Sequence, residues 1–178
     1  MPKKGSPMEF SEVLANRRSV RHFNAKRDLS DAEIRVLLNA AVVAPSAGNI
    51  QPWRFTVVRS AEARARLAGA MHQRWAAAAP VIIVVSVDPR PCYARYGDRG
   101  EQLYAIQDTA AAVQNILLTA VDRGLAACWV GAFDEKAVAE AVQVKPPIRP
   151  VAVLPIGYSA ESGSRPERRP LGELTTWL

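Results

Sequence analysis

The sequence predicts a single domain of the α+β class. Apolar residues make up 49% of the 178 residues, enough to bury a sizeable core. Segments with helical spacing of apolar residues mix with short β-branched runs, without the strict strand-helix-strand alternation of a parallel sheet. No internal repeat or linker divides the chain. We therefore expect one domain over residues 8–178, preceded by a flexible tail over residues 1–7.

The first half of the domain begins with two predicted helices. Met8–Asn16 forms the first, and Ser30 begins the second because Glu33 follows it at the spacing of a capping box. Pro45 ends the second helix. The remaining elements of this half are a strand at Phe55–Val58, a helix over residues 61–76, a central strand at Val81–Val85 and a polar covering loop at Asp88–Gly100.

The second half contains the longest predicted helix, which Gly124 terminates. Asp134 caps a shorter helix that ends near Val142. The expected elements are, in order, the helix Glu101–Arg123, the strand Ala126–Val130, the helix from Asp134 to Val142, the strand Val151–Ile156 and a polar tail beyond Gly157.

Composition excludes several classes of function. The net charge of +6 and the pI near 9.7 suggest nucleic acid, but the two arginine clusters, at 17–21 and 165–169, contain no interleaved aromatics. Clusters this compact suit a small anion better than a polyanion. No apolar run is long enough to cross a membrane, and no apolar stretch follows the basic start, as a signal peptide requires. We expect a cytoplasmic protein.

Cysteine and histidine are too few and too scattered for a metal centre or a disulfide framework. Cys92 and Cys128 lie far apart without a C-x-x-C spacing. His22 and His72 are the two histidines, which argues against a multi-histidine metal site. We therefore expect free thiols and a reducing compartment.

Two segments offer groups that suit a flat, anionic ligand. In the first, Arg17, Arg18, Ser19 and Arg21 supply forked guanidinium donors and a hydroxyl, and alternate positions of an extended chain face one side. In the second, small residues allow the backbone to come close to a flat ligand, and two amide side chains supply donors and acceptors for the edge of a heterocycle. The members of this segment are Pro45, Ser46, Ala47, Gly48, Asn49 and Gln51. Taken singly, a solvated basic stretch and an ordinary helix-to-strand turn explain these segments better than a ligand does.

Two further segments are candidates. At the end of a predicted strand, backbone amides become available around Val130, Gly131 and Ala132. In the tail, Arg168 and Arg169 are candidate ligands only if the tail folds back so that they contact a bound phosphate. The sequence contains no dinucleotide glycine motif, P-loop or G-x-S-x-G elbow. A cofactor that brings its own reactivity therefore fits better than side-chain catalysis.

Together these segments resemble the nitroreductase family of FMN enzymes. The motifs that carry the resemblance are Arg-Arg-Ser-Val-Arg-His-Phe (17–23), Ala-Pro-Ser-Ala-Gly-Asn-Ile-Gln-Pro-Trp-Arg-Phe (44–55), Gln-Asp-Thr-Ala-Ala-Ala-Val-Gln-Asn (107–115), Gly-Leu-Ala-Ala-Cys-Trp-Val-Gly-Ala-Phe (124–133) and Pro-Ile-Gly-Tyr (155–158). They occur in the family's order and span nearly the whole chain.

The resemblance implies a mostly antiparallel sheet flanked by helices, in a domain-swapped homodimer whose C-terminal tails reach the partner and whose interface binds two FMN molecules. It assigns the FMN phosphate and pyrimidine edge to the 17–21 segment, and the partner's share of the site to Ser46–Asn49. The backbone at Val130–Ala132 would reach flavin N5 and O4. The tail departs from the family pattern at Pro166-Glu167-Arg168-Arg169, so either arginine is a candidate phosphate ligand. The long helix would be a dimer element, with Gln107 and Asp108 structural.

The function implied is hydride transfer from NADH or NADPH to FMN, followed by electron transfer to a nitroaromatic, quinone or similar small molecule in a ping-pong cycle. The stretch Tyr93-Ala-Arg-Tyr96 would shape the pocket. Alternatives are a flavin-destroying synthase, a dehalogenase or an enoate-type reductase on the same fold, and a flavin-binding module without turnover.

Overall fold

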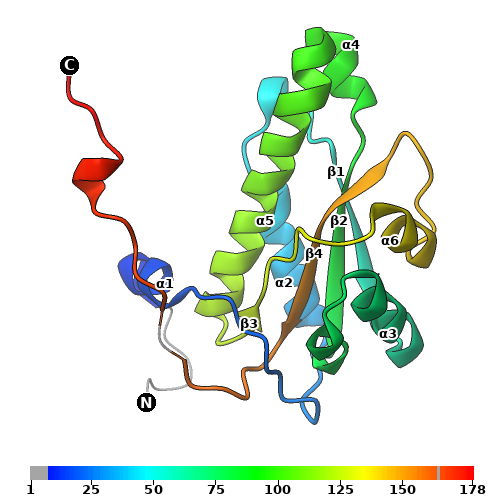
Figure 1. The fold of residues 1–178 in the computed structure, drawn as a ribbon, viewed down its shortest axis with the longest axis vertical. Coiled ribbons are helices and arrows are strands. Elements are labelled where there is room, and N and C mark those ends of the chain that lie inside the picture. Colours follow the sequence, from blue (N-terminus) through cyan, green and yellow to red (C-terminus); the bar gives the residue numbers. More distant parts are fainter. Residues whose placement is uncertain (1–7, 164) are drawn as a thin grey trace.

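A four-stranded antiparallel sheet forms the centre of the protein (Figure 1). We describe a computed structural model over residues 8–163 and 165–178; the tail predicted at residues 1–7 lies outside the described residues. The strands are β1 (Trp53–Val58), β2 (Val81–Val87), β3 (Ala126–Ala127) and β4 (Arg149–Gly157), in the spatial order β1-β2-β4-β3. Every neighbouring pair is antiparallel, as the family resemblance implies.

Strand β2 is buried along its whole length, which confirms the central strand predicted from its β-branched run. Successive side chains point to opposite faces. Val81, Ile83 and Val85 therefore join one core cluster, whereas Ile82 and Val84 join another. The strand has two apolar faces because helices cover both sides of the sheet.

The helices divide between the two faces (Figure 1). Apolar residues of α2 (Asp31–Val42) and α5 (Ala105–Asp122) pack in the first cluster, and those of α3 (Ala61–Ala70) and α6 (Glu135–Ala141) pack in the second. The short helix α1 (Phe10–Asn16) packs on α5. No helix in the described part of the chain is long and apolar enough to cross a membrane.

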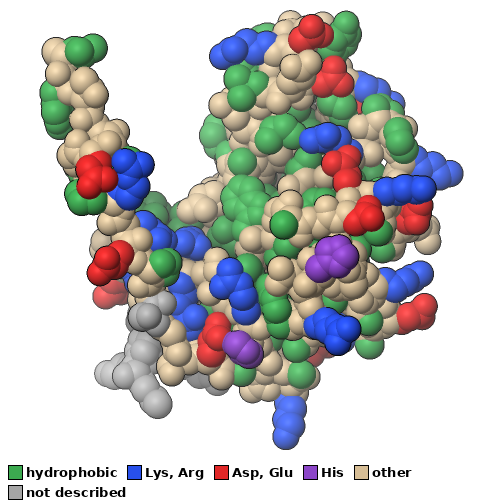
Figure 2. Space-filling view, viewed as in Figure 1, with side chains coloured by type: hydrophobic (Ala, Val, Ile, Leu, Met, Phe, Trp, Pro, Cys, Tyr) green, Lys and Arg blue, Asp and Glu red, His purple; other side chains and the backbone are tan. Residues whose placement is uncertain are grey.

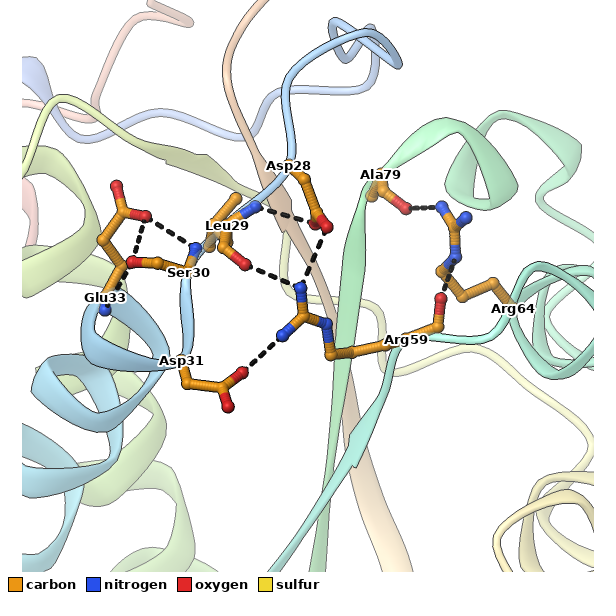
Figure 3. A network of polar contacts seen from close by, with 8 residues as sticks. All are labelled: Asp28, Leu29, Ser30, Asp31, Glu33, Arg59, Arg64 and Ala79. Atoms are coloured by element: carbon orange, nitrogen blue, oxygen red, sulfur yellow. Dashed lines mark hydrogen bonds and ion pairs between the residues drawn. The ribbon is translucent and has the colours of Figure 1, made fainter.

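The start of α2 is fixed by two sets of polar contacts (Figure 3). The predicted capping box is confirmed, since the Glu33 amide donates to Ser30 Oγ and the Ser30 amide donates to Glu33 Oε2. Arg59, directly after β1, donates to Asp28, Leu29 and Asp31. These contacts join the segment before α2 to the end of the edge strand.

The expectation of a polar loop at Asp88–Gly100 is wrong, because most of this segment is the helix α4 (Arg90–Arg99). Its prolines suggest a loop, but Pro89 is the N-cap and Pro91 lies in the first turn, where the missing amide hydrogen costs nothing. Gly97 interrupts α4 with a φ of 61°. The π-helical turn η3 (Gly100–Tyr104) follows, so the long helix α5 begins later than predicted.

Other boundaries differ for local reasons. The helix predicted to residue 76 ends at Ala70, because His72 has a φ of 53°, and the short turn η2 (Arg74–Ala78) follows. Strand β3 is shorter than predicted, and Val130 pairs with β4 only through an isolated bridge. Strand β4 accommodates Pro150 because the register with β2 shifts there, as at a bulge.

Candidate functional site

The basic segment 17–21 lies between the end of β3 and the chain that follows β4. The Val20 amide donates to the Ala127 carbonyl at 3.1 Å, and the Asn24 amide donates to the Tyr158 carbonyl at 2.8 Å. Val20 and Phe23 are buried in a small apolar cluster, whereas Ser19 and Arg21 are exposed. The segment is therefore held by its backbone and its apolar residues, which leaves polar side chains available for a ligand.

The alternate residues Arg17, Ser19 and Arg21 all lie close enough to the Cys128 thiol to affect its pKa. Burial raises the pKa of this thiol, while the charges of Arg21 and Arg17 and a hydrogen bond with Ser19 oppose the rise. The residues thus reach one place, as the alternation of an extended chain predicts. Two guanidinium groups and a hydroxyl here form a donor set suited to a phosphate.

Arg18, also predicted as a flavin ligand, pairs with Glu161 in this chain. Its Nη2 donates to the Glu161 carbonyl at 2.9 Å and its Nη1 to Glu161 Oε1 at 3.4 Å. The same carboxylate accepts from the Arg21 amide at 3.0 Å and contacts His22 Nδ1. The Arg21 amide, then His22, lower the pKa of Glu161 to about 2. Glu161 therefore anchors the chain after β4 to the basic segment, a role that the sequence did not reveal.

The second segment forms the short turn η1 (Ala47–Asn49) between α2 and β1. Gly48, Asn49 and Gln51 all have positive φ values, of 56°, 58° and 55°. The hydroxyl of Ser46 accepts from the Gln51 amide at 3.1 Å, and the Gln51 side chain donates to Asn49 Oδ1 at 3.2 Å. The amide groups predicted to meet a ligand are therefore held together by one compact turn, beside Pro45.

The side chain of Asp108, in α5, forms a hydrogen bond with the backbone of η1. Its Oδ1 accepts from the Ala47 amide at 3.0 Å, and its side chain is buried. Oδ2 is also buried and has no partner among the described residues. Burial raises the pKa of this carboxyl, and the bond from Ala47 opposes the rise. The structural role predicted for Asp108 thus takes a specific form, the bracing of η1.

The two candidate segments lie near opposite ends of α5 (Figure 1). Ala47 bonds to Asp108 in the first turn of this helix, whereas Ser19 pairs with Ala127, soon after the helix ends. At 1.5 Å per residue, the helix between these ends is on the order of 20 Å long. One chain therefore does not bring the basic segment and η1 together.

The backbone at 130–132 is only partly available to a ligand. The Val130 amide donates to the Val153 carbonyl at 2.9 Å and is already bonded. Gly131 and Ala132 are exposed, and in the described part of the chain their amides have no hydrogen-bond partner. Gly131 also lines a cavity of about 240 Å³, together with Phe133 and Arg149.

Comparison with known proteins settles the family. The profile of the nitroreductase family matches residues 14–79 and 71–158, which contain the basic segment, η1, Asp108 and the backbone at 130–132. The chain belongs to the nitroreductase family. The chain is 34% identical to a protein of Archaeoglobus fulgidus that bears the name "Putative NADH dehydrogenase/NAD(P)H nitroreductase", over 84% of this chain and 85% of the relative. It is 31% identical to an NADH dehydrogenase of Thermus thermophilus, over 96% of each chain.

Solved structures of other proteins have the same fold as this chain. A nitroreductase family protein from Clostridium novyi NT superposes with a TM-score of 0.79 at 29% identity, covering 86% of this chain and 87% of that one. A protein from Exiguobacterium sibiricum, solved in complex with FMN, gives a TM-score of 0.86 at 22% identity, covering 99% of this chain and 100% of that one. At that identity the second comparison supports the fold alone.

The C-terminal tail follows the matched region and extends away from the body of the protein (Figures 1 and 2). Arg165 reaches back to Asn16, where its Nη2 donates to Oδ1 at 3.3 Å. Arg168 donates to the Pro166 carbonyl at 3.1 Å, and Arg169 donates to Glu173 at 3.2 Å. The described chain therefore does not bring Arg168 and Arg169 to its own basic segment.

Proposed function

We propose that this member of the nitroreductase family is an FMN-dependent oxidoreductase that oxidises NADH or NADPH and reduces a nitroaromatic, a quinone or a related small acceptor. The observation that carries the proposal is the basic segment beside the end of β3, where Ser19 is exposed and Arg17 and Arg21 form no ion pair among the described residues. The names of relatives that include NAD(P)H, and a structural neighbour solved with FMN, support it.

The donor set fits FMN. Arg17 and Ser19 would hold the phosphate, since a guanidinium and a hydroxyl both donate to phosphate oxygens. Arg21 would face the pyrimidine edge of the ring, and the amides of Gly131 and Ala132 would donate near N5 and O4. In the described part of the chain neither Arg17 nor Arg21 forms an ion pair, so both cations are available to an anionic ligand.

Bound FMN would supply the redox chemistry, accepting two electrons and a proton as hydride and passing both electrons to the acceptor. The protein's own residues bind and orient. Arg21 would stabilise negative charge near N1 and O2, because a fixed cation costs no reorganisation when that charge develops. The amides of Gly131 and Ala132 would donate without taking up a proton. No side-chain acid is needed for this cycle.

We further propose that the active form is a homodimer. The basic segment and η1 lie near opposite ends of α5, so a second copy would bring its Ser46–Asn49 turn to the first copy's basic segment. Arg168 and Arg169 would close on the partner's phosphate site in a tail exchange. Large apolar side chains that a partner would cover are Phe10, Leu14, Val42, Val43, Leu171, Leu174 and Trp177, all exposed in the single chain.

The test is an absorbance spectrum of the purified protein, followed by NADH and NADPH oxidation with a panel of nitroaromatics and quinones. We expect a yellow protein that oxidises a reduced nicotinamide only when an acceptor is present. A colourless protein that ignores added FMN would overturn the proposal. Light scattering on a sizing column measures the oligomeric state. An active, flavin-containing monomer would overturn the proposal that the active form is a dimer.

A further inference from the structure

The helix α4 places a cation and a phenol directly against the η1 turn. Arg95 Nη1 donates to the Gly48 carbonyl at 3.0 Å. A Cβ built on Gly48 would lie 2.6 Å from Arg95 Cζ and also 2.6 Å from the hydroxyl oxygen of Tyr96. A larger residue at this position would displace the ends of both side chains, and the φ of 56° at Gly48 also favours glycine. The turn proposed to meet the partner's flavin is therefore lined by Arg95 and Tyr96.

Helix α4 packs against η3, while most of its own residues are exposed. A Cβ on Gly100 would lie 2.2 Å from the carbonyl oxygen of Cys92, so η3 folds directly onto α4. The Cys92 side chain is fully buried below this contact. Tyr96 also meets Tyr104 of η3 edge to face, with ring centres 5.4 Å apart. Helix α4 thus lies beside η1 and is supported by η3; we call its Tyr93–Tyr96 surface the wall.

The outer surface of this wall is aromatic and cationic. Tyr93 is 53% exposed and Tyr96 is 37% exposed. The Arg95 guanidinium lies 5.4 Å from the centre of the Tyr96 ring. Asp98 and Glu101 follow Arg95 in the sequence, but among the described residues the Arg95 guanidinium forms an ion pair with neither. Its side-chain hydrogen bond there is the one to the Gly48 carbonyl. A guanidinium has five N–H donors, so most of them remain for a ligand.

We propose that Arg95 and Tyr96 select substrates in which a planar ring carries an anionic group. The guanidinium of Arg95 would bind a carboxylate or phosphate, and the Tyr96 ring would contact the plane of the substrate. This inference rests on the proposed function, because η1 brings the wall to the flavin of the partner. The anionic group belongs either to the acceptor, as a ring carboxylate, or to the reductant, as a phosphate of NADH or NADPH.

The experiment compares kcat/KM for 4-nitrobenzoate with that for the neutral 4-nitrobenzyl alcohol, and measures KM for NADH and NADPH. The variants are Arg95→Gln, Arg95→Lys and the control Arg66→Gln, which changes an exposed arginine on α3. We expect Arg95→Gln to lower the ratio of nitrobenzoate to alcohol activity by about fivefold, the effect of one exposed charge pair. Arg95→Lys should restore part of the ratio, and Arg66→Gln should leave it unchanged.

The possible outcomes separate the two proposals. A selective rise of KM for the nicotinamides, with an unchanged acceptor ratio, assigns the anion to the reductant and supports the inference. Without a selective rise of KM for NADH or NADPH, equal losses with both acceptors, or an acceptor ratio equal to that of the wild type, would mean that Arg95 only braces η1 and would overturn the inference. In both of those cases the wild type is yellow and active, so the proposed function stands. A wild type without flavin overturns both.

Discussion

Asp108 allows the hydrogen bond that holds η1 to be separated from the buried charge that accompanies it. Asp108→Asn keeps an acceptor for the Ala47 amide and removes the charge, whereas Asp108→Ala removes both. Oδ1 accepts from that amide at 3.0 Å in the wild type. A buried donor left without its acceptor costs about 1–3 kcal/mol. We therefore expect the alanine variant to be less stable than the asparagine variant by that amount.

The energetic effect of the buried Asp108 charge is measured by the pH dependence of the free energy of unfolding. Burial raises the pKa of Asp108 above its ordinary 3.8. The folded protein then keeps this proton to a higher pH than the unfolded chain, so its contribution is complete below 3.8 and is lost as pH rises through the raised pKa. Because asparagine does not titrate, the stability of Asp108→Asn relative to wild type should increase over this interval and then stay level.

Urea unfolding of the wild type and both variants, at several pH values from about 3 to 8, tests this reasoning. Glu12→Gln, which removes an exposed carboxylate from α1, is the control for the loss of a surface carboxylate. Equal midpoints for the two Asp108 variants would refute the hydrogen-bond argument. A constant difference between Asp108→Asn and wild type at every pH would refute the argument from the buried charge.

Three further predictions address the flavin site, the tail and the core. Arg17→Gln and Arg21→Gln should each weaken FMN binding about tenfold or more, as expected for hydrogen bonds to a charged group; quenching of flavin fluorescence measures this, with Arg66→Gln as the unaffected control. Glu161 has a lowered pKa, so its stabilising contacts are complete above 4.5 and are lost as pH falls through about 2. Thermal unfolding of Glu161→Gln should lack this acid dependence, and a wild-type dependence in the variant would contradict the anchoring role. Ile83→Ala, in the fully buried strand β2, should cost about 2–5 kcal/mol in chemical unfolding, and a cost below about 1 kcal/mol would mean that the core refills the space.

The sequence predicted best the features that depend on neighbouring residues. Ser30 and Glu33 lie three positions apart and form the capping box that their spacing indicates. The β-branched run from Val81 became the central strand because such a run is apolar on both faces. The alternation of Arg17, Ser19 and Arg21 likewise required only an extended backbone.

Features that depend on distant pairs could not be predicted in this way. Glu161 bonds to Arg18 across 143 residues, and Asp108 bonds to Ala47 across 61. No local pattern marks such partners, because each carboxylate alone is typical of a solvated surface. The helix α4 was missed for a different reason. Pro89 and Pro91 break a helix interior but are accepted at its start, and the sequence does not distinguish these positions until the following turn is known.

The separation of the basic segment from η1 along α5 has a genetic consequence. In the proposed dimer each site takes Arg17 from one subunit and Gly48 from the other. A subunit with a defective Arg17 and a subunit with a defective Gly48 would each form inactive homodimers. When the two are expressed together, half of the sites in a mixed dimer would contain both defects and the other half neither. Two inactive alleles would then complement each other, and activity would follow the fraction of mixed dimers.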